Sequence, residues 1–204
     1  ELDNHLNDEI VKNLFVFGDV TSTLAGAITA KNNNIRCLHV EAGLRSRNLD
    51  MPEERNRMMV DAICDKLYTP SSDAVQNLLS ENVAIEKIKN VGNIMIDTLV
   101  KNFDHIVSKE NFDPAEFSLE RNYFVLTLHR PINLTDNNLK IIFDAVSQFT
   151  KDYDILIPAH PRLKDFVVKN NIDTKKFKVI NPQPYIKFLG LVNNSTLCLT
   201  AVSY

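Results

Sequence analysis

The chain has 204 residues, of which 44% are hydrophobic and 24% are charged, and its formal net charge is −3 at pH 7. This composition is typical of a folded globular protein with room for one large or two small domains, and the charge argues against a bulk nucleic-acid or membrane-surface binder. The three cysteines lack metal-ligand spacing, no signal-peptide pattern opens the chain, and no apolar run approaches the ~20 residues of a membrane span, so we expect a cytoplasmic protein.

The first half of the chain alternates short apolar strands with helices. The predicted strands cover 14–17, 35–40, 65–70 and 87–93; one helix follows the capping residues Thr21–Thr23, one runs over 52–63, and one follows Ser71–Asp73. This alternation is typical of a doubly wound parallel sheet.

The second half repeats the pattern after a weaker stretch. A helix is expected around 97–108 and a loop around Pro114; strands are then predicted at 123–127, 155–158, 178–180 and 197–200, with an amphipathic helix through 139–149. The fold class is therefore α/β, with an N-terminal Rossmann-like domain over 1–95, a linker over 96–118 and a C-terminal Rossmann-like domain over 119–204. Two such domains in tandem suggest a ligand cleft between them.

One stretch, residues 36–57, carries an unusual density of charge. The chain leaves a predicted strand at Glu41 and turns on Gly43; Asp50 is then a plausible N-cap for a helix that has Glu53 in its first turn. Glu53 and Arg57 lie four residues apart, on one helical face. Spacing alone leaves two interpretations open, a surface salt bridge on a capped helix or part of a site.

Ionisable residues follow several of the predicted strands. Asp19, Glu41, the pair His129–Arg130, and His160 each stand at a strand's carboxyl end, and such ends share one edge of a parallel sheet. Each alone could be a cap or a structural histidine. Together they suit a phosphorylated substrate, because arginine and histidine bind phosphate and paired carboxylates act as acid and base. The sequence contains no P-loop, G-x-G-x-x-G or H-E-x-x-H motif, so neither a metal nor another cofactor is indicated.

At these residues the sequence resembles the UDP-N-acetylglucosamine 2-epimerase family, in particular its non-hydrolysing members. The matching segments keep the family's order over about residues 14–200. They are F-G-D-V-T-S at 17–22, H-V-E-A-G-L-R at 39–45, P-E-E-R-N-R at 52–57, V-G-N at 91–93, T-L-H-R at 127–130 with N-L at 133–134, and P-A-H-P at 158–161.

The resemblance implies two Rossmann-like domains of glycosyltransferase-B type with a UDP-sugar in the cleft between them. It implies interconversion of UDP-GlcNAc and UDP-ManNAc, for surface polysaccharide precursors, by elimination of UDP to 2-acetamidoglucal and re-addition. By position, Asp19, Glu41 and Glu53 match the family's catalytic acids and His129 its histidine near the diphosphate. Arg57, Arg130 and His160 match substrate-binding positions, the last two being allosteric in some members. Family members are commonly dimers, so a homodimer is one expected assembly.

The chain also departs from the family pattern at both ends. Family members open with a G-T-R-P-E loop, for which nothing before Leu14 is a match, and they continue L-T-D-S-G-G where this chain has Leu199–Tyr204. We therefore expect a fragment, a truncated gene product or one piece of a split protein. Two alternatives to the epimerase stay open: a hydrolysing relative that releases ManNAc and UDP, and a non-catalytic paralogue that binds nucleotide sugar.

Overall fold

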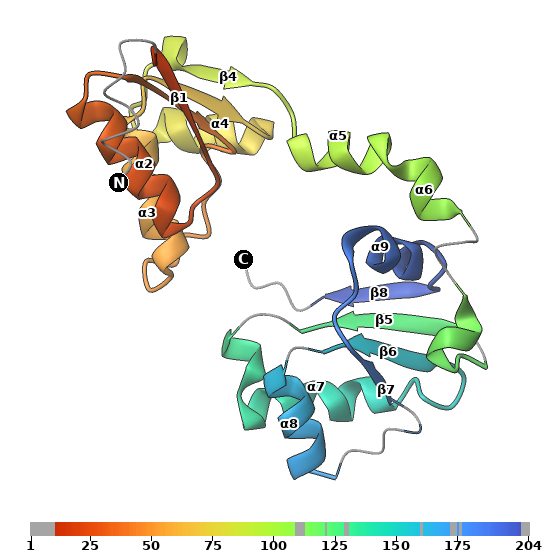
Figure 1. Cartoon of the computed structure of the whole chain (residues 1–204). Coiled ribbons are helices and arrows are strands. Elements are labelled where there is room, and N and C mark those ends of the chain that lie inside the picture. Colours follow the sequence, from red (N-terminus) through yellow and green to blue (C-terminus); the bar gives the residue numbers. More distant parts are fainter. Residues whose placement is uncertain are drawn as a thin grey trace. The chain divides into compact units, whose positions relative to one another are not determined.

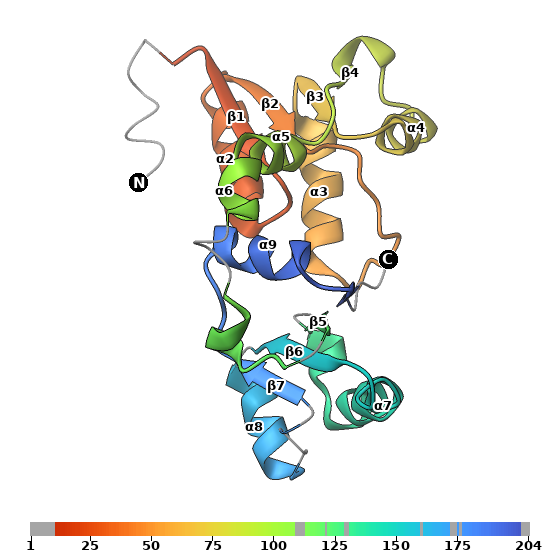
Figure 2. The same ribbon diagram turned by 90° about the vertical axis from the view of Figure 1, so that its right-hand side faces the viewer.

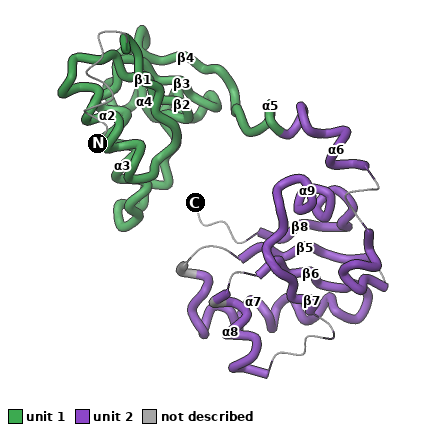
Figure 3. The backbone as a smooth tube through the Cα atoms, in the orientation of Figure 1, with its two compact units in different colours: residues 1–98, 204 green, residues 99–203 purple. Residues whose placement is uncertain are grey.

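The computed structural model describes residues 11–108, 113–120, 122–128, 131–159, 161–171, 175 and 177–200. The chain forms two compact units, of which the first ends at Thr98 and the second begins at Leu99 (Figure 3). Among the described helices, none is both long and apolar enough to cross a membrane. His129, Arg130 and His160 lie outside the described residues.

The first unit is built on a parallel sheet with the strand order β1-β2-β3-β4 (Figure 1). Its strands are β1 (Asn13–Phe17), β2 (Arg36–Val40), β3 (Lys66–Thr69) and β4 (Ile88–Asn90), and its helices are α2 (Thr21–Asn32), α3 (Pro52–Ile63), α4 (Ser72–Ser80) and the short 3-10 turn Ile85–Lys87. Because the strand order always advances in one direction, right-handed crossovers place all three α-helices on the same face.

Alternate strand residues of the first unit supply the core on that face. Val16, Cys37 and Leu67 pack together with Ala27 of α2 and Val60 of α3, and all five are buried. Phe15 and Phe17 point to the opposite face and remain more than half exposed. Buried and exposed residues thus alternate along the strand, as expected where only one face of the sheet is covered.

Two of the predicted helix caps are wrong. The N-cap of α3 is Met51 rather than Asp50, and its side chain makes no cap hydrogen bond because methionine has no oxygen to accept one. The N-cap of α2 is Val20, and the Thr23 hydroxyl instead donates to the Phe17 carbonyl at 2.6 Å. The Ser71 cap of α4 is confirmed, since its hydroxyl accepts from the Ala74 N–H at 3.3 Å.

The second unit contains another parallel sheet, with the order β7-β6-β5-β8. Its strands are β5 (Tyr123–Thr127), β6 (Asp154–Pro158), β7 (Phe177–Ile180) and β8 (Leu197–Thr200); its α-helices are α6 (Phe103–Val107), α7 (Asp136–Ser147), α8 (Pro161–Lys169) and α9 (Tyr185–Asn193), with 3-10 turns at Pro114–Phe117 and Pro131–Leu134. The helices α8 and α9 were not predicted from the sequence.

The strand order of the second unit reverses at β5, and helices accordingly cover both faces (Figure 2). Phe124 packs against Phe143 of α7 and Phe166 of α8 in one core, and Val125 packs against Leu191 of α9 in the other. With this unit, the prediction of an α/β protein with parallel sheets is confirmed.

The segment between the two sheets differs from its prediction. In place of one helix around 97–108, the structure has α5 (Ile94–Lys101) and α6, with Asn102 between them. The side chains of α5 are exposed, while α6 contacts α9 and buries Ile106. The domain limits at 95 and 119, and a ligand cleft between the domains, stay predictions.

Candidate functional site

The carboxyl ends of β1 and β2 bring Asp19 and Glu41 to one edge of the first sheet. The two strands are neighbours in parallel register, with Phe17 opposite Val40, and the Gly18 N–H donates to the Val40 carbonyl at 3.1 Å. Asp19 and Glu41 therefore follow adjacent strands at the same level. This is the edge at which open α/β sheets hold ligands.

Arg57 of α3 joins the two strand ends. Its Nη2 forms an ion pair with the Asp19 carboxylate, and its Nη1 donates to the Glu41 carbonyl at 3.5 Å. Asn56 adds a third contact, from its Nδ2 to the Asp19 carbonyl at 2.9 Å. Among the described residues, Asp19 is thus the carboxylate partner of Arg57, and the interpretation of Glu53 and Arg57 as a salt bridge along the helix is wrong.

Glu41 has an unusual backbone conformation. Its φ is +72°, in the left-handed region that non-glycine residues rarely occupy. The N–H groups of Glu41 and Ala42 both donate to the Tyr68 carbonyl, at 3.1 and 3.0 Å, and so hold this turn. The Glu41 carboxylate, which no described residue contacts by a hydrogen bond or ion pair, lies over Gly18. Strain of about 1–3 kcal/mol of this kind persists only where surrounding contacts hold it, and it is concentrated at functional sites.

Glu53 lies in the first turn of α3, one turn before Arg57 on the same helical face, and its side chain is exposed. Arg57 thus pairs with the Asp19 carboxylate and contacts the Glu41 carbonyl, while Glu53 forms no hydrogen bond or ion pair with any described residue. The roles of all these residues, and of His129, Arg130 and His160, stay predictions.

The loop after Glu41 is attached to α3 by Glu54. Both of its carboxylate oxygens accept backbone hydrogen bonds, from the N–H of Ser46 and of Arg47, each at 2.8 Å. Burial raises the pKa of Glu54, but these hydrogen bonds outweigh burial and hold the pKa below its ordinary value of 4.5. Glu54 therefore fixes the path of the loop over the start of the helix.

A buried charged network lies beneath the site, and sequence analysis did not single it out. His39 is fully buried, and its Nδ1 lies 2.7 Å from the Asp61 carboxylate, which also accepts from Arg45 Nη1 at 2.8 Å. Arg45 in turn pairs with Glu81 through two hydrogen bonds of 2.7 Å. No periodic pattern identifies these residues in the sequence, because the chain leaves the extended conformation at Glu41 and turns at Gly43.

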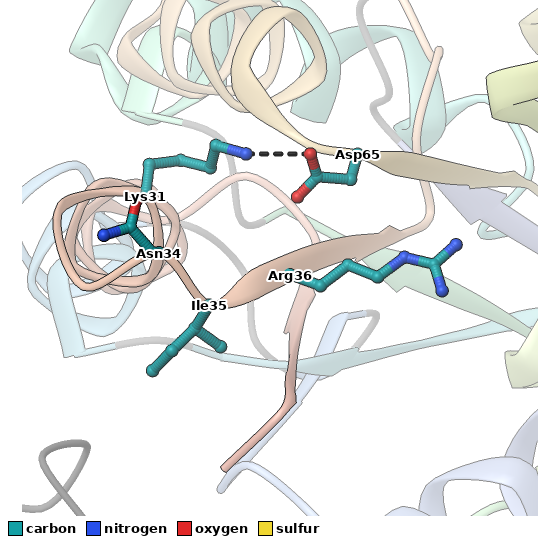
Figure 4. A pocket seen from close by; sticks show the side chains of 5 residues that line it. All are labelled: Lys31, Asn34, Ile35, Arg36 and Asp65. Carbon is teal, nitrogen blue, oxygen red and sulfur yellow. Dashed lines mark hydrogen bonds and ion pairs between the residues drawn. The ribbon is translucent and has the colours of Figure 1, made fainter. Parts of the chain in front are cut away.

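A hollow lies at the opposite edge of the same sheet (Figure 4). It is lined by Lys31, Asn34, Ile35, Arg36 and Asp65 and encloses about 340 Å³. Lys31 and Asp65 form an ion pair of 2.8 Å across it, and Asp65 also accepts from the Cys37 N–H at 2.8 Å. Because it lies at the amino ends of β2 and β3, away from the usual ligand edge, we assign these residues a structural role.

The described residues contain no cluster of three or more His, Cys, Asp or Glu side chains that could hold a metal ion. The described part of the site contains two strand-end carboxylates, a guanidinium and an exposed glutamate at a helix start. Such a set can transfer protons and neutralise a negatively charged ligand.

Comparisons with known proteins identify relatives along the whole chain. A family model described as UDP-N-acetylglucosamine 2-epimerase matches residues 1–203. A UDP-N-acetylglucosamine 2-epimerase of Methanococcus maripaludis is 36% identical over 200 residues, which cover 92% of this chain and 54% of the relative. A UDP-2,3-diacetamido-2,3-dideoxy-D-glucuronate 2-epimerase of Pseudomonas aeruginosa is 31% identical, over 98% of this chain and 56% of that protein.

The fold is also shared with solved structures. The crystal structure of Methanocaldococcus jannaschii UDP-GlcNAc 2-epimerase in complex with UDP-GlcNAc and UDP superposes with a TM-score of 0.84 at 36% identity, covering 98% of this chain and 58% of that one. The chain spans about half the length of the curated relatives it matches.

Proposed function

Because this chain belongs to the UDP-N-acetylglucosamine 2-epimerase family, we propose that it takes part in the epimerisation of a UDP-activated 2-acetamido sugar at C2. The observation that carries the proposal is the Asp19–Arg57 ion pair beside the strained Glu41, at the carboxyl ends of adjacent parallel strands. It is supported by the relatives, which are named as epimerases that bind or act on such sugars.

The proposed reaction is an elimination followed by a re-addition. A carboxylate accepts the proton from C2 while the C1–O bond breaks and its electron pair leaves with UDP, which gives 2-acetamidoglucal. In the return step a UDP oxygen attacks C1 and a proton is delivered to the opposite face of C2. No redox change occurs, and inversion at C2 requires proton-transfer groups on both faces.

Within this proposal, Glu41 is the group best suited to accept the C2 proton. Its carboxylate has no hydrogen-bond or ion-pair partner among the described residues, whereas that of Asp19 is engaged by Arg57. Glu53 is the second proton-transfer group, on the neighbouring helix start, and Asp19 orients Arg57. His129, Arg130 and His160 remain, from the resemblance, the groups for the diphosphate and the nucleotide sugar.

The test is incubation of the chain with UDP-GlcNAc in deuterated water. We expect NMR to detect deuterium at C2 and the appearance of UDP-ManNAc. Both signals should be lost in Glu41→Gln. UDP-GlcNAc that remains unlabelled at C2 would contradict the proposal for this chain.

The products and binding behaviour separate the alternatives. Free ManNAc and UDP would indicate a hydrolysing enzyme, and binding of UDP without labelling at C2, measured by calorimetry, would indicate a non-catalytic paralogue. If C2 of UDP-2,3-diacetamido-2,3-dideoxy-D-glucuronate is labelled and C2 of UDP-GlcNAc is not, this chain acts on the sugar for which the Pseudomonas aeruginosa relative is named. A cytoplasmic location, a homodimer and a role in surface polysaccharide precursors remain part of the proposal.

A further inference from the structure

One buried carboxylate, that of Asp61 on α3, receives hydrogen bonds from both sides of Glu41. His39 Nδ1 lies 2.7 Å from Oδ1, and the Gly43 N–H and Arg45 Nη1 lie 3.1 and 2.8 Å from Oδ2. These three partners stand two residues before, two residues after and four residues after Glu41. The Asp61 side chain is only 2% exposed, so water does not compete for these bonds.

Two side chains of this network each connect Asp61 to a second partner. The Gly18 carbonyl can only accept a hydrogen bond, so His39 Nε2, 2.8 Å away, carries a proton and the ring bridges Gly18 and Asp61. Arg45 bridges Asp61 and Glu81. Burial lowers the pKa of Arg45, but its hydrogen bonds to Glu81 and Asp61 outweigh burial and raise the pKa above its ordinary value.

The same ring reaches the other strand end of the site. The carbonyl that His39 binds belongs to Gly18, directly before Asp19 in the chain. On the other side, Asp61 fixes Gly43, whose φ of +81° continues the left-handed turn that begins at Glu41. The left-handed conformation is unfavourable for a residue with a side chain, so without these bonds the turn would relax toward an extended conformation.

We propose that Asp61 is a positioning residue: through His39, Gly43 and Arg45, its carboxylate holds Glu41 in the strained turn from which Glu41 transfers the C2 proton. This inference rests on the proposed function of Glu41. His39, Gly43 and Arg45 all contact Asp61, whereas the Glu41 carboxylate lies over Gly18.

The test compares Asp61→Asn with wild type in two assays. Asparagine keeps the shape but loses the charge, so we expect kcat for C2 deuterium exchange to fall by ~100-fold while KM stays within about twofold, as for a misplaced reactive group. By NMR, we expect the His39 ring signals to shift and the Glu41 amide to exchange hydrogen about tenfold faster than global destabilisation alone explains.

The matched control is Ile88→Ala, which removes core packing on β4, at the far side of the sheet from β1. It should lower stability while leaving kcat and the His39 ring signals unchanged. An Asp61→Asn variant that behaves like this control in kcat and in Glu41 amide exchange would overturn the inference. If Asp61→Asn does not fold, Arg45→Gln removes one of the three partners, and an unchanged Glu41 amide would then overturn it. A wild-type chain that labels no substrate contradicts the proposed function alone, because the NMR measurements still test the positioning.

Discussion

Arg57 and Asp19 form an ion pair between residues 38 positions apart in the sequence. The Arg57 side chain is 9% exposed and that of Asp19 is 27% exposed, so the pair is only partly accessible to solvent. It connects the middle of α3 to the chain just after β1 and places both groups at the ligand edge of the sheet. The interaction therefore belongs to the site as well as to the packing of the first unit.

We expect Arg57→Met to lower the free energy of unfolding by about 1–3 kcal/mol, because the Asp19 carboxylate would lose a charged partner. A double-mutant cycle with Asp19→Asn, measured by urea unfolding, should give a coupling energy of about 0.5–3 kcal/mol. The control is Arg55→Met, an exposed arginine on the same helix, which should stay within about 0.5 kcal/mol of wild type. If the changes in unfolding free energy of the two substitutions simply add, the Asp19–Arg57 ion pair does not stabilise the protein.

Glu53 and Glu54 are neighbours with opposite expected behaviour. Glu54→Gln should destabilise the protein by about 1–3 kcal/mol, because an amide cannot accept both loop N–H groups as a carboxylate does. Glu53→Gln, at an exposed position, should change stability by less than about 0.5 kcal/mol but reduce C2 labelling of UDP-GlcNAc. Urea unfolding and the deuterium assay on the same two variants check this; a stable Glu54→Gln protein would refute the structural role.

Stability should fall in acid. Glu54 and Asp65 both have a pKa below the ordinary values of 4.5 and 3.8, for Asp65 because the Lys31 and Cys37 hydrogen bonds outweigh burial, which raises it. Since the unfolded chain then binds more protons than the folded chain, their contribution is present above about pH 4.5 and is lost as pH falls through the folded-state values. Urea midpoints between pH 3 and 7 should show this loss, and a flatter profile is expected in Glu54→Gln with Asp65→Asn. An equally steep profile in that variant would assign the acid sensitivity to other groups.

Gly43 and Gly92 form a matched pair, since both have positive φ, at +81° and +84°. A Cβ at Gly43 would lie 2.5 Å from the Ala74 carbonyl oxygen, whereas at Gly92 it would meet nothing within 4 Å. We expect Gly92→Ala to cost about 1–2 kcal/mol from backbone strain alone, and Gly43→Ala to cost about 1–3 kcal/mol more from the added clash with α4. Equal losses in thermal unfolding would show that the loop does not pack this closely on α4.

Thiol reactivity reports the packing of the three cysteines. Cys37 and Cys64 are buried with their sulfurs 3.1 Å apart, whereas Cys198 on β8 is exposed. We therefore expect one thiol to react readily with Ellman's reagent in the native protein and three in denaturant. Cys198→Ser should abolish the native reaction; if it does not, Cys37 or Cys64 is accessible.

Local sequence was sufficient for much of the fold. The strand at 123–127 and the helix at 52–63 were predicted with the bounds that the structure has, because their apolar patterns and flanking polar residues act within a few positions. The Ser71 cap was equally local. The caps of α2 and α3 were mispredicted because a polar residue near a helix start has other partners available, as Thr23 has in the Phe17 carbonyl.

For the site, the sequence predicted that Asp19 and Glu41 follow two parallel strands, and the structure places these strands next to each other. The sequence could not determine the partners of the site residues: spacing paired Arg57 with Glu53, and the structure pairs it with Asp19. Nor did it single out Asp61, whose three partners come from another element of the chain. Only the tertiary structure decided these contacts. A buried charge is stable only beside an opposite charge, and the packing of α3 on the sheet decides which one lies within reach.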